Sequence, residues 1–151
     1  MAPERSKALV AARWFGGLML IATGAVHLEQ YIAVHYGVIP LIGPLFLVNF
    51  AIGVVLGLVF LAPVGRLPRW ITTLVAVGGI VFAAGTIVAL EVAETGTLFG
   101  FHEHGYRIAI ILSIVFEGAA IVGLGAYLFG LRRREPVSAR RDAAAFGPAR
   151  T

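Results

Sequence analysis

An acidic residue inside an apolar segment is the sharpest chemical feature of this sequence. Glu117 lies ten residues after Arg107, within the apolar run 107–131. Ten residues of α-helix advance about 15 Å, which is near the centre of a hydrocarbon layer about 30 Å thick. A carboxylic acid at that depth is rare and faces the interior of a helical bundle, so Glu117 is a functional-site hypothesis by default.

Two other polar residues are expected beside this acid. Ser113 precedes Glu117 by four residues and therefore shares its helix face. Asn49 lies nine residues into a second apolar run, 41–62, which enters from the same side and reaches a similar depth. Two interpretations stay open: Glu117 is a protonated acid that bonds Asn49 and holds helices together, or it accepts a proton or contacts a ligand.

A second group of polar residues gathers at one end of the expected helices. His27, Tyr31 and His35 follow i, i+4, i+8 spacing, which places them on one stripe if the helix continues to Tyr36. Glu91 and Glu94, at the end of the third run, are expected at the same end. The His-x-His pair of His102 and His104, in the loop after that run, is expected there too. The ligand-binding candidates are His27, Tyr31, His35, Glu91, Glu94, His102 and His104.

The chemistry of this second group has four interpretations. Imidazole and carboxylate ligands suit divalent transition metals, and His27, His102 and His104 are the metal candidates. Haem held by two histidines needs two imidazoles that face each other. Alternatively, the histidines and tyrosines lie at headgroup depth, as aromatic belts do at membrane surfaces. A quinone-like or lipid-like ligand could also enter at this aromatic end.

Four apolar runs of spanning length position these residues. Hydrophobic residues make up 59% of the 151-residue chain and charged residues 13%, whereas soluble domains carry about 25% charged residues. Each run approaches the roughly 20 residues that a spanning helix needs. We therefore predict an all-α, polytopic membrane protein, an antiparallel four-helix bundle. The predicted spans are 13–36, 41–62, 70–91 and 107–131.

The charge distribution predicts the orientation of this bundle. If the two termini and the 63–69 loop share one side, that side holds eleven of the twelve basic residues, and only Arg107 lies opposite. The positive-inside rule then places both termini in the cytoplasm, in a multi-pass protein of a bacterial inner membrane. The flanks are a cytoplasmic segment, 1–12, and a basic tail, 132–151, which we predict to be disordered.

Small residues recur at the spacing that allows helices to approach closely in lipid. Gly53 and Gly57 are four apart in the second run. Gly79 pairs with Ala83 in the third run, and Ala119 pairs with Gly123 in the fourth. This pattern favours close helix packing over a glycine-rich ligand loop, because none of these glycines lies between a strand and a helix.

The first run resembles a known family. The order Arg13, Gly17, Gly24 and His27-Leu28, followed by three more short spans, resembles DoxX-like four-helix membrane proteins. The segment 39–49 is also similar to a pattern in uncharacterised bacterial four-span proteins. Some DoxX-like proteins are linked to quinone-dependent oxidation of sulfur compounds, so the resemblance implies a membrane bundle and a possible link to quinones. The cysteine-dependent relatives offer no guide, because this chain has no cysteine.

Three functions remain open from the sequence. The first is an accessory or interaction subunit that contacts the lipid bilayer and a membrane-protein partner or a second copy of itself. The second is a redox-associated subunit that binds a quinone, haem or a divalent metal near the outer face. The third is proton-coupled transport in an oligomer using Glu117. No strong catalytic signature is present, which favours a non-enzymatic role, and nothing requires a nucleic-acid partner.

Overall fold

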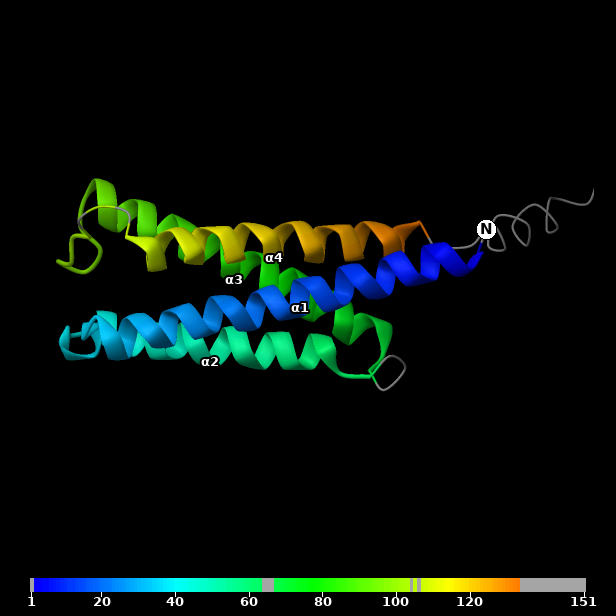
Figure 1. The fold of residues 1–151 in the computed structure, drawn as a ribbon, viewed down its shortest axis with the longest axis horizontal. Coiled ribbons are helices and arrows are strands. Elements are labelled where there is room, and N and C mark those ends of the chain that lie inside the picture. The colour runs from blue at the N-terminus through cyan, green and yellow to red at the C-terminus, as the bar shows by residue number, and fades with distance from the viewer. Residues whose placement is uncertain (1, 64–66, 104, 106, 134–151) are drawn as a thin grey trace, which may run out of the picture.

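The computed structural model describes residues 2–63, 67–103, 105 and 107–133, with side chains from Lys7 onward. Over these residues the fold is helical apart from turns and one isolated bridge between Leu98 and Phe101 (Figure 1). The elements in chain order are α1 (Ala2–Ala33), the short 3-10 helix η1 (Tyr36–Val38), α2 (Ile42–Leu61), α3 (Arg69–Thr95) and α4 (Ile108–Arg132).

Each of the four long helices is long and apolar enough to cross a membrane, which indicates a multi-pass membrane protein. Many large apolar side chains lie on the outside of the helices. Trp70, Val81, Val122 and Phe129 are all more than half exposed. Exposed apolar surface of this extent is the surface expected of helices that contact lipid acyl chains.

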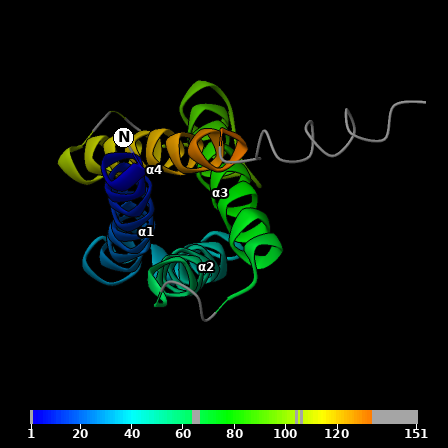
Figure 2. The ribbon, with the colours of Figure 1, turned by 90° about the vertical axis from the view of Figure 1, so that its right-hand side faces the viewer.

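The four long helices surround a central axis in the order α1, α2, α3, α4, and successive helices run in alternating directions (Figures 1 and 2). The contacts between them are unequal. α1 packs most extensively on α2 and next on α4, α3 packs on α4, and α2 and α3 share the fewest contacts among these pairs. The α2–α3 side is therefore the least tightly closed wall of the fold.

Glycines explain why α1 and α2 approach so closely. A Cβ atom added to Gly53 would lie 2.8 Å from the backbone oxygen of Leu20, and one added to Gly57 would lie 2.7 Å from that of Gly17. A Cβ added to Gly24 would meet the Phe50 oxygen at 2.9 Å. Because the backbones occupy the space of side chains, only glycine fits, as the spacing of Gly53 and Gly57 predicted.

A dense core fills the half of the fold near the amino-terminal part of α1. Leu20, Phe60 and Leu124 are fully buried there, and the Phe60 ring meets that of Tyr127 edge-on at 4.9 Å. Gly79 and Ala83 of α3 are also buried, and the Gly79 position faces Leu124 and Leu20. This half is consequently closed by side-chain packing.

Two arginines complete the same half by binding the ends of neighbouring helices. Arg13 donates hydrogen bonds to the carbonyl oxygens of Phe60 (2.6 Å) and Ala62 (2.7 Å) at the end of α2. Arg69 donates to the Leu131 carbonyl (2.8 Å) at the end of α4. The last carbonyls of a helix lack partners within the helix and carry partial negative charge, so guanidinium groups stabilise both ends.

Helix ends differ in places from the sequence-based boundaries. α1 begins at Ala2, well before residue 13, since Pro3 fits the first turn of a helix. It ends at Ala33, and His35 adopts a left-handed conformation (φ 60°) that stops the helix before Tyr36. α3 continues to Thr95, one turn beyond residue 91. The tail beyond residue 133 lies outside the described residues, so its predicted disorder stays a prediction.

Candidate functional site: a polar cavity between the helices

A cavity of about 410 Å³ lies in the half of the fold opposite the dense core. All four long helices and the turn after α3 line it, and most of its wall is apolar. The aromatic part of the wall consists of Phe46, Phe82, Phe99 and Phe101. The polar part consists of His27, Gln30, Asn49, Thr86, Glu103, Ser113 and Glu117. An apolar pocket with a few convergent polar groups is the usual form of a small-molecule site.

Glu117 lies on this wall with its side chain almost fully buried, at 1% exposure. Its Oε1 atom accepts a hydrogen bond from the Ser113 hydroxyl at 3.1 Å. The Nε2 atom of His27 lies 3.4 Å from the same Oε1 atom, which is within ion-pair distance although the geometry is not that of a hydrogen bond. Residues from α1 and α4 therefore form one polar cluster.

His27 and Gln30, which line the same cavity, carry polar atoms without partners. Both residues are more than nine-tenths buried, and His27 Nδ1, His27 Nε2 and Gln30 Oε1 have no hydrogen-bond partner within the described residues. The Phe46 ring meets the His27 ring edge-on at 5.4 Å and fixes its plane. Each buried polar atom without a partner costs about 1–3 kcal/mol, so these atoms favour a ligand that hydrogen-bonds.

Asn49 reaches the cavity wall from α2, as its depth in the sequence predicted. The hydrogen bond between Asn49 and Glu117 is not present among the described residues, where Ser113 and His27 are the partners of that acid instead. Ser113 reaches Glu117 within one helix turn, whereas Asn49 lies across the cavity. The side-chain amide of Asn49 therefore remains part of the polar wall of the cavity.

The charges on the cavity wall are acidic and already paired. Among the described lining residues there is no lysine or arginine, and the acids are Glu103 and Glu117. Glu117 is held by Ser113 and His27, and Glu103 by Tyr36 and Arg107. An anionic group would meet repulsion here, and a cation would find both carboxylates engaged. A neutral polar ligand suits this wall best.

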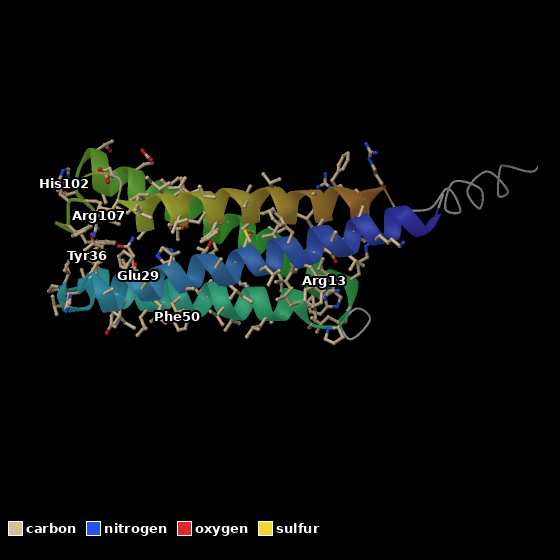
Figure 3. All side chains as sticks on the ribbon, viewed as in Figure 1. Arg13, Glu29, Tyr36, Phe50, His102 and Arg107 are labelled. Carbon is tan, nitrogen blue, oxygen red and sulfur yellow. The ribbon has the colours of Figure 1, made fainter. Side chains whose placement is uncertain are left out.

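Tyr36, Glu103 and Arg107 form a cluster at the outer edge of the cavity, at the opposite end from Arg13 (Figure 3). The Tyr36 hydroxyl donates to Glu103 Oε2 at 2.5 Å, and Arg107 donates to Glu103 Oε1 at 3.1 Å and to the Tyr36 oxygen. Burial, followed by the hydrogen bond and negative charge of Glu103, raises the pKa of Tyr36 to about 12.

A tight turn carries two aromatic side chains over this end of the cavity. Leu98 and Phe101 exchange two backbone hydrogen bonds (2.8 and 2.9 Å), while Phe99 and Gly100 between them have positive φ angles. Glu103 connects this turn to α3, because its backbone N–H donates a hydrogen bond to the Ala93 carbonyl at 3.0 Å. The turn is thus fixed to α3, and Glu103 links it to Tyr36.

The stripe predicted on the first helix is only partly present. His27 lines the cavity, but the prediction that His35 continues the stripe was wrong, because α1 ends at Ala33 and His35 is exposed. Tyr31 is half-buried and its ring lies against the backbone of Gly37, where an added Cβ atom would come within 2.9 Å of it. Tyr31 therefore supports η1 and does not line the cavity.

The other candidates lie in or beside the turn after α3 and do not line the cavity. Glu91 is exposed, Glu94 Oε2 accepts a hydrogen bond from the Gly105 N–H (3.3 Å), and His102 Nδ1 contacts the Gly96 oxygen. Within the described part of the chain, no three metal-binding side chains gather in one place. His104 lies outside the described residues, so the metal interpretation stays a prediction.

Sequence reasoning missed the Tyr36–Glu103–Arg107 cluster. Two signals were available: Glu103 and Arg107 have the i, i+4 spacing of an ion pair, and Arg107 is the single basic residue expected at this end. Tyr36 carried no comparable signal, because its contact with Glu103 depends on the turn that follows α1.

Comparisons of this chain with family models, with curated proteins and with solved structures find no match. The resemblance to DoxX-like proteins therefore stays a prediction.

Proposed function

We propose that this chain is a multi-pass protein of a bacterial inner membrane, an antiparallel bundle with both termini in the cytoplasm. The charge bias supports this topology, since Arg13 of α1 and Arg69, which binds the end of α4, lie at the end of the bundle where α1 begins and α4 ends. The cavity then opens in the outer half of the membrane. Tyr36, Glu103 and Arg107 lie at its outer surface.

Within that membrane, we propose that the protein is a small redox-associated subunit that binds a neutral, lipophilic molecule with a hydrogen-bonding ring head, such as a quinone. The observation that carries the proposal is an apolar cavity of about 410 Å³ lined by His27 and Gln30, two residues with buried polar atoms that have no partner among the described residues. The side chains of Phe46 and Phe82 offer apolar contact to a flat ring.

The polar groups around the cavity support a neutral head with more than one polar atom. His27 and Gln30 come from α1, Asn49 comes from α2, and Ser113 with Glu117 comes from α4. A ring that carries two oxygen atoms can meet two of these elements at once. A fatty acid or an anionic lipid head would instead place a negative charge beside Glu103 and Glu117.

The alternatives have less support. A purely interacting subunit would need Glu117 only as a contact between helices, which leaves the unsatisfied atoms of His27 and Gln30 without a role. Proton-coupled transport needs access from both sides of the membrane. Here Leu20, Phe60 and Leu124 fill the cytoplasmic half of the proposed bundle.

The test is to purify the full chain from its native membrane in lipid nanodiscs, extract bound lipophilic molecules and identify them by mass spectrometry. We expect a ring-headed neutral lipid in near-equal amount to the wild-type protein. We expect its loss from His27→Leu, in which the imidazole facing the cavity is gone.

The matched control is His35→Leu, which makes the same change at an exposed histidine outside the cavity. This variant should retain the wild-type amount of the lipid. A wild-type protein that carries no ring-headed lipid, or equal retention by the His27 and His35 variants, would contradict the proposal.

A further inference from the structure

Two residues in the side wall of the cavity are also exposed on the outside of the protein. Leu45 of α2 and Gly85 of α3 both line the cavity and are both exposed. They belong to the pair of helices that share the fewest contacts among neighbours. A Cβ atom added at Gly85 would have no other atom within 4 Å, so there is free space for a side chain at that position.

Apolar strips continue from this opening along the outer faces of both helices. On α3, Val81 and Val88 flank Gly85 on the same face and are 66% and 61% exposed. On α2, Val48 follows Leu45 by three residues and is 50% exposed. A chain that leaves the cavity here would pass between apolar surfaces and enter the lipid without crossing polar groups.

The outer end offers a poorer route for an apolar molecule. The Tyr36–Glu103–Arg107 cluster ties η1 to the turn after α3 and to the start of α4, and its three side chains are polar. Passage through it would require these hydrogen bonds to break in a partly buried setting. Among the described residues, no comparable hydrogen-bonded cluster closes the gap beside Gly85.

From these observations we propose that the gap between α2 and α3 is a lateral portal to the bilayer. Through it the ligand enters head first and its long apolar chain stays in the lipid. The ligand class is therefore a chain-bearing neutral lipid and not a small molecule delivered from water. This inference rests on the proposed binding function, and it assigns Leu45 and Gly85 to recognition of the chain.

The test measures equilibrium binding to the purified full chain in lipid nanodiscs with two probes. One probe is a chainless naphthoquinone, menadione, and the other is the same ring with a polyisoprenoid chain. Gly85→Leu places a side chain in the portal at a position with free space. We expect it to weaken binding of the chain-bearing probe about tenfold while binding of menadione changes less than about twofold.

The control is Gly78→Leu, seven residues earlier on the same helix, where an added Cβ atom also meets no atom within 4 Å and which does not line the cavity. It should bind both probes like the wild type. Unchanged binding of the chain-bearing probe by Gly85→Leu, or an equal loss of both probes, would overturn the portal. A wild-type protein that binds neither probe would instead contradict the proposed function.

Discussion

At the scale of single residues, the polar side of the cavity is built around one buried acid. Glu117 lies near His27 and accepts from Ser113, while Asn49 stays on the facing wall. In the proposed function, Glu117 is a positioning residue that acts on the ligand through its contact with His27.

The first prediction concerns this positioning role. Glu117→Gln should weaken menadione binding about tenfold, because the amide replaces the acid beside His27 and changes the contact that positions the imidazole ring. The helical content should not change, since the glutamine oxygen still accepts from Ser113. Binding titrations and circular dichroism on one preparation measure both quantities.

The matched control for this change is Glu91→Gln, because Glu91 is exposed and outside the cavity wall. If Glu117→Gln binds the probe as tightly as the Glu91 variant does, then Glu117 serves only to hold helices together.

The second prediction concerns the ionisation of Tyr36. Its pKa is raised from 10.0 to about 12 by burial and by Glu103, so the folded protein favours the neutral phenol. The resulting stabilisation is complete below pH 10 and is lost as the pH rises towards 12. The tyrosinate absorbance of the wild type minus that of Tyr36→Phe should show a midpoint near 12.

Replacing Glu103 separates the effect of its charge on the Tyr36 pKa from the effect of burial. In Glu103→Gln the negative charge is gone while the burial remains, so the Tyr36 midpoint should fall below that of the wild type. A wild-type midpoint at the ordinary tyrosine value, unaffected by this replacement, would show that the cluster does not form.

At the scale of helices, close packing on one side of α1 leaves space on the other side of the bundle. Gly17 and Gly24 bring α1 against Gly53 and Gly57 of α2, whereas α2 and α3 have few contacts. The sequence predicted the glycine pairs because their spacing alone carries the signal. It did not predict the open wall, because an open wall depends on how far apart two helices lie.

The third prediction separates glycines that pack from glycines that face free space. Gly53→Leu should lower stability by about 1–3 kcal/mol, since its Cβ atom would lie 2.8 Å from a backbone oxygen that cannot move aside. Gly78→Leu should be neutral or slightly stabilising, because leucine has the higher helix propensity. Thermal unfolding of both variants in one detergent gives the comparison.

Equal thermal unfolding midpoints for Gly53→Leu and Gly78→Leu would mean that α1 and α2 do not approach each other closely at Gly53.

At the scale of the whole molecule, the fold has a dense cytoplasmic half and a hollow outer half in the proposed orientation. Hydropathy alone predicted four helices of spanning length, which the structure confirms. The candidates Glu117, Ser113 and Asn49 all line one cavity, the first two from α4 and Asn49 from α2. The described histidines of the predicted group do not gather, because α1 ends at Ala33, which leaves His35 exposed, and the turn after α3 holds His102 against Gly96. Such turn geometry leaves little trace in composition or spacing.

The fourth prediction tests the orientation. The chain has no cysteine, so single cysteines report their own side of the membrane. An impermeant maleimide should label Thr97→Cys in intact spheroplasts, because Thr97 is exposed at the outer end in this topology. It should label Ser138→Cys in the basic tail only after the membrane is opened. The reverse pattern would invert the proposed topology.

The most direct test of the central claim is equilibrium binding of menadione to the purified wild-type chain and to its His27→Leu and His35→Leu variants. The account predicts one saturable site per chain, about tenfold weaker in His27→Leu and unchanged in His35→Leu. Absence of saturable binding, or equal affinity in all three proteins, would contradict the claim that the polar cavity is a ligand site.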